Sequence, residues 1–237
     1  MHVERRRLLL MRHGSVDYFD AEGRPYPPDD VPLTAQGVVQ ARAMGEALRD
    51  TPVDRVVTSG LRRTRETAQH VLEAAQLDPP VEHWPDFQEI RGGRLSAIRD
   101  DELRDAFLAA FEGAVPRDTR FLGGETIGEL LDRALPALQR LLADDDWDTA
   151  LLVAHGGVNR AVLSWFLTGQ HVFLGGLAQD AGCLNVIDVG PTPAKSVVRV
   201  VNFCAIDTLR TGTRLSTMEE LLQKYLKSRA RPESEPI

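Results

Sequence analysis

The sequence has little cysteine, with only Cys183 and Cys204 among its 237 residues. Two cysteines cannot build a disulfide framework, and this usage favours a reducing compartment. The chain also lacks a long apolar run: Leu8–Met11, which follows three arginines, is shorter than the roughly 7–15 residues of a signal-peptide core and the roughly 20 of a membrane span. We therefore expect a cytoplasmic protein with no membrane partner, in which both cysteines are buried as small hydrophobic residues.

Basic residues are outnumbered by acidic ones. The 28 lysines and arginines against 35 aspartates and glutamates give a formal net charge of −7. Such a chain has no overall attraction for nucleic acid, so an anion site must be a local basic pocket. The ordinary fractions of hydrophobic (43%) and charged (27%) residues exclude the collagen-like, fully disordered and coiled-coil classes.

Short apolar runs alternate with helical patterns along the chain. Strands are predicted at residues 8–11, 55–58, 81–84, 149–154, 184–189 and 197–203, and helices at 35–49, 61–76, 100–111, 127–143, 158–167 and 218–227. This alternation indicates an α/β fold: a three-layer, doubly wound, mostly parallel sheet with helices on both faces. Pro136 is expected to kink or interrupt its helix. We expect one domain over residues 1–228 and a disordered tail over 229–237.

Chemically active residues directly follow three of the predicted strands. Arg12 and His13 follow the first, residues 58–63 follow the second, and His155 to Gly157 follow the strand at 149–154. If these strands are parallel, the residues meet at one edge of the sheet, where doubly wound folds bind ligands. Arginine forks bind phosphate oxygens, neutral histidine is a competent nucleophile, and a helix that starts near Gly156 directs free N–H groups at an anion. The pattern favours phosphoryl transfer.

No metal or other cofactor is needed for this chemistry, because the arginines can supply the positive charge. The remaining histidines, His2, His70, His83 and His171, lack metal-ligand spacing and are expected to be structural or at the surface. A metallohydrolase that uses His13 and His155 would lack further carboxylate and histidine ligands at recognisable spacing.

Six motifs, in this order, resemble those of the histidine phosphatase superfamily, the phosphoglycerate-mutase-like proteins. They are Leu10-Met11-Arg12-His13-Gly14, Leu33-Thr34 with Gly37 and Gln40-Ala41, Ser59-x-Leu61-x-Arg63 with Thr67-Ala68, Phe87-Gln88-Glu89-Ile90 with Gly92-Gly93, Gly124-Glu125-Thr126, and Val153-Ala154-His155-Gly156-Gly157. The resemblance spans about residues 8–203 and implies the phosphoglycerate-mutase-like fold.

The resemblance also implies a role for each matching residue. It makes His13 the nucleophile that becomes phosphorylated, Arg12 and Arg63 the arginines of the phosphate pocket, and His155 a donor to a phosphate oxygen. Glu89 matches the general acid that protonates the leaving alcohol and later activates water. Because a carboxyl beside arginines tends to stay ionised, we expect the bound phosphate itself to favour the protonated form of Glu89.

The segment after His13 departs from the family's pattern. Ser15 and Val16 stand where members often have Glu or Gln followed by Ser or Thr, and an asparagine common a few residues later is absent. Gly92-Gly93-Arg94-Leu95 likewise lacks the usual Gly-x-x-Glu-Gly with an aromatic residue. Because of these departures, the resemblance does not identify the substrate.

Substrate contacts are expected from the loop that follows the first strand. We assign Ser15, Tyr18 and Arg62 to this substrate loop and expect residues 15–32 to form a mobile lid. A second anion site could be built from Arg24, Arg91, Arg94 and Arg99.

The leading interpretation is a metal-independent phosphatase that hydrolyses a small phosphomonoester through a phosphohistidine at His13. A cofactor-dependent phosphoglycerate mutase is an alternative, but the many acidic residues within 17–30 and 100–129 suit a substrate with one phosphate and a neutral or cationic remainder. A non-catalytic phosphate-binding module of the same fold is a second alternative, although all the catalytic positions are filled by the expected residue types. The two C-terminal strands could pair across a homodimer.

Overall fold

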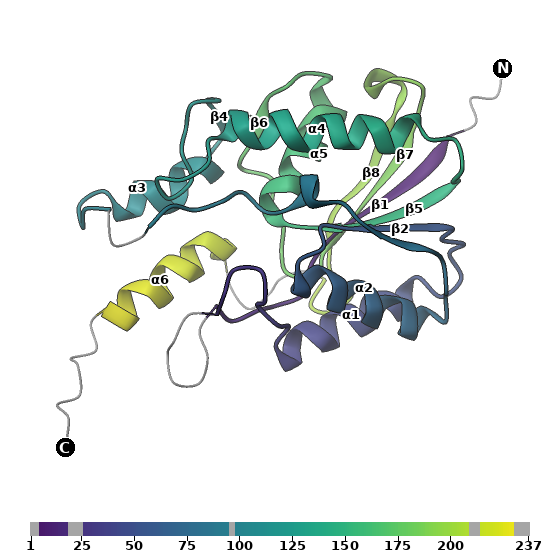
Figure 1. Cartoon of the computed structure of the whole chain (residues 1–237), viewed down its shortest axis with the longest axis horizontal. Helices are drawn as coiled ribbons and strands as arrows, with labels where there is room; N and C mark the ends of the chain where they lie inside the picture. The colour runs from purple at the N-terminus through teal and green to yellow at the C-terminus, as the bar shows by residue number, and fades with distance from the viewer. Residues whose placement is uncertain (1–4, 19–25, 95–97, 209–213, 230–237) are drawn as a thin grey trace.

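The structure is a computed structural model that describes residues 5–18, 26–94, 98–208 and 214–229 (Figure 1). Its main sheet has six strands in the order β3-β2-β5-β1-β7-β8. Their bounds are β1 Arg6–Arg12, β2 Arg55–Thr58, β3 Val81–His83, β5 Thr149–Ala154, β7 Leu184–Val189 and β8 Val197–Phe203. Strands β1, β2, β3 and β5 run parallel, whereas β7 pairs antiparallel with both β1 and β8. The mostly parallel sheet predicted from the sequence is confirmed.

Helices cover both faces of this sheet. α1 (Ala35–Ala47) and α2 (Arg62–Ala75) lie on one face, and α4 (Ile127–Ala143) and α5 (Gly156–Thr168) lie on the other (Figure 1). Side chains of β1 alternate between the two cores: Leu8 and Leu10 pack with α4 and α5, and Leu9 and Met11 pack with α1 and α2. A strand that is buried on both faces needs apolar residues throughout, which explains the continuous apolar run at 8–11.

Shorter elements lie around this three-layer core. They are η1 (Pro85–Phe87), α3 (Leu103–Leu108), η3 (Ala109–Phe111), β4 (Ala114–Val115), β6 (Phe173–Leu174), η4 (Pro193–Lys195) and the last helix, α6 (Thr217–Arg229). β4 and β6 form a small second sheet, which the sequence analysis missed because a two-residue strand shows no periodicity. α6 packs against α3, with the rings of Phe107 and Tyr225 5.7 Å apart.

Two of the predicted helix starts are fixed by their caps. The Thr34 hydroxyl accepts a hydrogen bond from the Gly37 N–H at the start of α1. At the start of α4, Thr126 and Glu129 each bind the other's backbone N–H and so form a capping box. These caps place the first turns of both helices where the sequence predicts them.

Other details also differ from the prediction, and the helix expected over 100–111 is the shorter α3 followed by η3. The interruption expected at Pro136 is wrong, since α4 continues through it, and the buried Leu135 and Leu138 beside it stabilise the helix beyond the roughly 3 kcal/mol that an internal proline costs. α6 includes Arg229, which was assigned to the tail, and residues 230–237 lie outside the described residues. None of the helices in the described ranges is long and apolar enough to cross a membrane.

Candidate active site

The carboxyl ends of β1, β2 and β5 meet at one edge of the sheet. β5 lies between the other two and pairs in parallel with both. The His13 N–H donates to the carbonyl of Ala154 at 3.1 Å, and Ser59 Oγ hydrogen-bonds His155 Nε2 at 2.8 Å. The residues that follow the three strands therefore form one cluster, as the sequence analysis expected.

The ring of His13 is held in one orientation by its own chain. Nδ1 lies 2.7 Å from the carbonyl oxygen of Gly14, and because a carbonyl can only accept, Nδ1 carries the proton. The neutral ring then keeps an unprotonated Nε2. Burial, Arg63 and Arg12 hold the pKa of His13 well below its usual value. His13 is thus a neutral imidazole with a free lone pair at neutral pH.

His155 lies beside His13, with the ring centroids 5.1 Å apart and the planes at 63°. Its Nε2 bonds Ser59, while its Nδ1 is buried and has no protein partner. Burial lowers the pKa of His155 well below its usual value, and Arg63 and His13 lower it further. Both histidines are therefore kept neutral by the same buried, positively charged surroundings.

Two buried arginines surround the histidine pair. Arg12 Nη1 donates to the carbonyl of Gln179 at 2.5 Å and to Thr217 Oγ1 at 2.9 Å, and Arg63 Nη1 donates to the carbonyl of Pro28 at 2.9 Å. The Nε atoms of both arginines are buried without a partner. A buried N–H group without an acceptor is costly, so the Nε–H groups of the two arginines suit a bound oxyanion.

Glu89 reaches this cluster across the start of α5. Its Oε1 accepts from the N–H groups of Gly157 and Ile90, both at 3.0 Å. A Cβ at Gly157 would lie 2.6 Å from Oε1, and a Cβ at Gly156 would lie 3.7 Å from both Arg12 Nε and Glu89 Oε2. Gly157 therefore leaves the space in which the carboxylate faces the first turn of the helix, whereas a Cβ at Gly156 would meet Arg160 Nη1 first, at 3.2 Å.

The residues assigned to a substrate loop have other partners. The Ser15 N–H donates to Gln40 Oε1, and half-exposed Tyr18 accepts at its carbonyl from Tyr26. The Arg62 guanidinium pairs with Glu66 and Asp30. Within the part of the chain that the structure describes, no hydrogen bond or ion pair joins Ser15, Tyr18 or Arg62 to the histidine pair, and their substrate role stays a prediction. Residues 19–25 of the expected lid lie outside the described residues.

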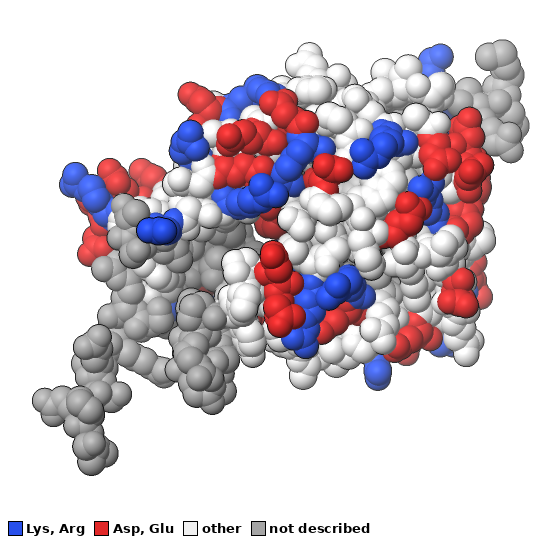
Figure 2. All heavy atoms as spheres, in the orientation of Figure 1, with Lys and Arg blue, Asp and Glu red and all other residues white. Residues whose placement is uncertain are grey.

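The expected second anion site is only partly described. Arg91 and Arg94 are exposed, Arg99 pairs with Asp101 at 2.9 Å, and Arg24 lies outside the described residues. No group of three or more histidine, cysteine, aspartate or glutamate side chains suited to a metal occurs in the described part of the chain. On the face seen in Figure 2, acidic and basic side chains are interspersed rather than gathered by sign.

The other histidines and the cysteines are structural where they are described. His83 Nδ1 hydrogen-bonds the Thr58 hydroxyl, and His70 lies 3.4 Å from Glu73. Both cysteines are free and buried, as expected, and burial raises the pKa of the Cys183 thiol to about 12. A cavity of ≈ 420 Å³ opens near Arg6 and Trp165, at the opposite edge of the sheet, and contains none of the clustered residues.

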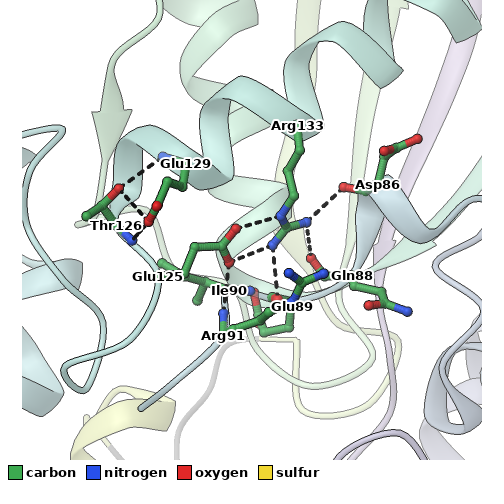
Figure 3. Close-up of polar contacts among 9 residues, drawn as sticks. All are labelled: Asp86, Gln88, Glu89, Ile90, Arg91, Glu125, Thr126, Glu129 and Arg133. Carbon is green, nitrogen blue, oxygen red and sulfur yellow. Dashed lines mark hydrogen bonds and ion pairs between the residues drawn. The ribbon is translucent and has the colours of Figure 1, made fainter.

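Sequence reasoning missed several residues that hold this site. Arg133 of α4 binds the carbonyl of Glu89 and the carboxylate of Glu125 (Figure 3). Thr217 of α6 binds Arg12. Arg133 lies on α4 and Glu125 directly precedes the Thr126 cap of that helix, so their separation of only eight positions is a local signal. The Arg12–Thr217 contact joins residues 205 positions apart, and nothing local in the sequence announces it.

The chain matches the family model described as the histidine phosphatase superfamily (branch 1) over residues 8–202. It is 31% identical over 190 residues to an adenosylcobalamin/alpha-ribazole phosphatase of Salmonella typhimurium, covering 77% of this chain and 90% of that protein. It is 33% identical over 152 residues to a probable phosphoglycerate mutase, GpmB, of Salmonella paratyphi A, covering 63% of this chain and 69% of that protein.

Among solved structures, it is similar to a mycobacterial glucosyl-3-phosphoglycerate phosphatase in complex with VO3. The TM-score is 0.66 at 26% identity, and the match covers 83% of this chain and 98% of the other. The histidines, arginines and Glu89 lie within the residues that match the family model, whereas α6 lies beyond them.

Proposed function

Because this chain belongs to the histidine phosphatase superfamily, we propose that it hydrolyses a small phosphomonoester through a phosphohistidine at His13. Its similarity to named phosphatases over most of its length makes it a phosphoric monoester hydrolase of the histidine phosphatase type. The observation that carries the proposal is the neutral His13 ring, whose Nδ1 proton is bound by Gly14, among buried donors that have no protein partner.

In the first step, His13 Nε2 attacks the phosphorus of the substrate and the ester oxygen leaves. The phosphoryl oxygens are held by Arg12 and Arg63, with the neutral ring of His155 beside them, and the positive charge and hydrogen bonds of the two arginines stabilise the transition state. Glu89 donates its proton to the leaving oxygen, so that the alcohol departs neutral. The products of this step are the alcohol and phosphohistidine.

In the second step, water attacks the phosphorus and the P–N bond breaks. Glu89, now ionised, takes a proton from the water, which restores its protonated form while His13 regains its lone pair. Inorganic phosphate leaves the arginine pocket. The cycle consumes one water and needs no metal ion, since the charge comes from Arg12 and Arg63.

The substrate class is a small phosphorylated metabolite with a single phosphate. Relatives named for alpha-ribazole and glucosyl-3-phosphoglycerate support a small organic phosphate. The relative named as a probable mutase keeps phosphoglycerate mutase as the competing activity. The two activities differ in whether the phosphohistidine passes its phosphoryl group to water or to a second phosphorylated ligand.

The deciding experiment measures hydrolysis of p-nitrophenyl phosphate in EDTA by the wild type, His13→Ala and His171→Ala. His171 is exposed and serves as the matched control. We expect activity in the wild type and His171→Ala and its loss in His13→Ala. Activity that survives His13→Ala would refute the assignment of the nucleophile. A wild type that is inactive here, but interconverts phosphoglycerates once primed with a bisphosphoglycerate, would be a mutase.

A further inference from the structure

Glu89 stands on a segment without regular secondary structure. It follows η1, and Gln88 to Arg94 form neither helix nor strand. A general acid must be held close to its productive geometry, and irregular backbone does not do this unaided. The contacts that fix this segment therefore decide where the Glu89 carboxylate lies.

Arg133 of α4 binds the chain on the N-terminal side of Glu89 and at Glu89 itself (Figure 3). Its Nη1 donates to the carbonyls of Asp86 at 2.8 Å and Gln88 at 2.6 Å, and its Nη2 donates to the carbonyl of Glu89 at 3.1 Å. One planar guanidinium thus donates hydrogen bonds to three backbone carbonyls of a segment that has no regular secondary structure around Glu89.

Glu125 fixes both this arginine and the chain on the other side of Glu89. Its carboxylate accepts from Arg133 Nε at 2.7 Å and from Nη2 at 2.9 Å, as a fork. It also accepts from the Arg91 N–H at 2.9 Å, and its own N–H donates to the Arg91 carbonyl at 2.8 Å. Glu125 and Arg133 are largely buried, with side chains 9% and 17% exposed.

The packing leaves this arrangement little freedom to shift. A Cβ at Gly124 would lie 2.3 Å from the Arg91 carbonyl oxygen, and a Cβ at Gly93 would lie 2.8 Å from that of Leu122. The backbone around Glu125 therefore runs directly against the backbone that follows Glu89. After removal of the ion pair, backbone contacts would still hold the chain after Glu89, but Asp86, Gln88 and Glu89 would lose the side chain that binds their carbonyls.

We propose that Arg133 and Glu125 are positioning residues that hold Glu89 where it protonates the leaving group. The inference rests on the proposed function, in which Glu89 is the general acid. It predicts a specific kinetic signature, because an alkoxide leaves poorly without a proton whereas p-nitrophenolate leaves as a stable anion. Loss of positioning should therefore slow hydrolysis of alkyl phosphates and spare p-nitrophenyl phosphate.

The test compares kcat/KM for glycerol phosphate and p-nitrophenyl phosphate in the wild type, Arg133→Met, Arg133→Lys, Glu125→Gln and Glu89→Gln. This constant covers the steps up to departure of the leaving group, so the later hydrolysis of phosphohistidine does not mask the effect. Because a misplacement of about 1 Å can cost about 100-fold, we expect Arg133→Met to lose about 10- to 100-fold on glycerol phosphate and less than about threefold on p-nitrophenyl phosphate. Glu89→Gln should show the same pattern, more strongly.

Glu129→Gln is the matched control. Glu129 stands on the same helix and also binds backbone, but it caps α4 at Thr126 and does not touch the Glu89 segment (Figure 3). We expect it to affect both substrates equally and slightly. Arg133→Lys, which keeps the charge but not the fork, should fall between the wild type and Arg133→Met.

Each outcome separates the inference from the proposed function. An equal fall on both substrates in the Arg133 and Glu125 variants would overturn the positioning role, since a general loss of structure lowers both. If Glu89→Gln hydrolysed glycerol phosphate and p-nitrophenyl phosphate in the same ratio as the wild type, Glu89 would not be the general acid. Arg133→Met is replaced in the test if it fails to fold, as shown by loss of binding to inorganic phosphate. The ratio of kcat/KM for glycerol phosphate to that for p-nitrophenyl phosphate in Arg133→Lys and Glu125→Gln then tests the positioning role.

Discussion

His13 and His155 face each other edge to plane, with ring centroids 5.1 Å apart, at the ends of the adjacent parallel strands β1 and β5. Each ring is buried, and each has its pKa lowered, first by burial and then by Arg63. Two histidines this close could not both be protonated without strong repulsion. The parallel pairing of the strands thus places two neutral imidazole rings side by side.

The first prediction concerns stability against pH. Both histidines have folded-state pKa values below the unfolded value of about 6.5, so below that pH the unfolded chain binds more protons than the folded one. The free energy of unfolding should therefore fall as the pH decreases below about 6.5. Urea unfolding at several pH values should show a shallower fall for His155→Gln and an unchanged fall for His171→Gln, whose side chain is exposed. A fall that is the same in all three proteins would contradict the prediction.

The second prediction distinguishes Arg63 from its neighbour Arg62. Arg63 is buried with an unpartnered Nε, whereas Arg62 is paired with Glu66 and Asp30 at the surface. Loss of a charge-assisted hydrogen bond costs about 1.5–3 kcal/mol, so Arg63→Met should lower kcat/KM about 10- to 100-fold. Arg62→Met should stay within about twofold of the wild type, as expected for an exposed pair.

A pH profile adds a second signature for the same pair of variants. Arg63 lowers the pKa of His13 and of His155, so its removal should raise both pKa values. The acid limb of kcat/KM should then move to higher pH in Arg63→Met and remain in place in Arg62→Met. If Arg62→Met lowered kcat/KM more than Arg63→Met, Arg62 and not Arg63 would be the arginine that binds phosphate.

The predictable part of the fold is the part with a local pattern. β2, β5, β7 and β8 coincide with the predicted strands because each is a short apolar or β-branched run bounded by turns. α1 and α4 start where a threonine can cap them. Pro136 does not interrupt α4, because burial of the helix around it offsets the local cost of the proline, which is a tertiary effect.

The residues of the candidate site were likewise predictable where a local pattern marks them and not where the contact depends on tertiary packing. Arg12, His13 and His155 were found because they directly follow strands whose carboxyl ends must meet in a parallel sheet. Arg133 and Thr217 were missed because their partners are distant in sequence and the contacts depend on how helices pack. The ion pairs of Arg62 with Glu66 and Asp30 could not be read from the sequence, because counting charges along a chain does not show which of them meet, and the substrate role of Ser15, Tyr18 and Arg62 stays a prediction.

The third prediction concerns Thr217, which lies beyond the residues matched by the family model. Its hydroxyl and the Gln179 carbonyl together bind Nη1 of Arg12, which leaves the Nε edge of the guanidinium for the phosphate. Thr217→Val keeps the shape and removes this acceptor. Because a hydrogen bond contributes about 1 kcal/mol, the affinity for inorganic phosphate should fall about fivefold.

Calorimetric titration with phosphate measures this effect directly. Thr208→Val is the control, since the Thr208 hydroxyl donates to the Cys204 carbonyl instead. Tighter binding of phosphate by Thr217→Val would show the opposite role, in which Thr217 competes with phosphate for Arg12.

The fourth prediction uses the glycine that faces the general acid. A Cβ at Gly157 would lie 2.6 Å from Glu89 Oε1, so Gly157→Ala must push the carboxylate away and break its hydrogen bond to the Gly157 N–H. Alanine also favours the first turn of α5 by up to about 1 kcal/mol, so stability should not suffer greatly. We expect kcat/KM for an alkyl phosphate to fall about 100-fold.

Gly176→Ala is the control for this substitution, because its Cβ would come no closer than 3.8 Å, at Gly113 N, to the described residues other than its chain neighbours. It should leave both substrates and the thermal midpoint nearly unchanged. Gly157→Ala should again spare p-nitrophenyl phosphate, because only the proton donor moves while His13 and the arginines stay in place. An intact rate on the alkyl phosphate would mean that Glu89 can protonate the leaving group from elsewhere, and the close approach of Gly157 would then serve packing alone.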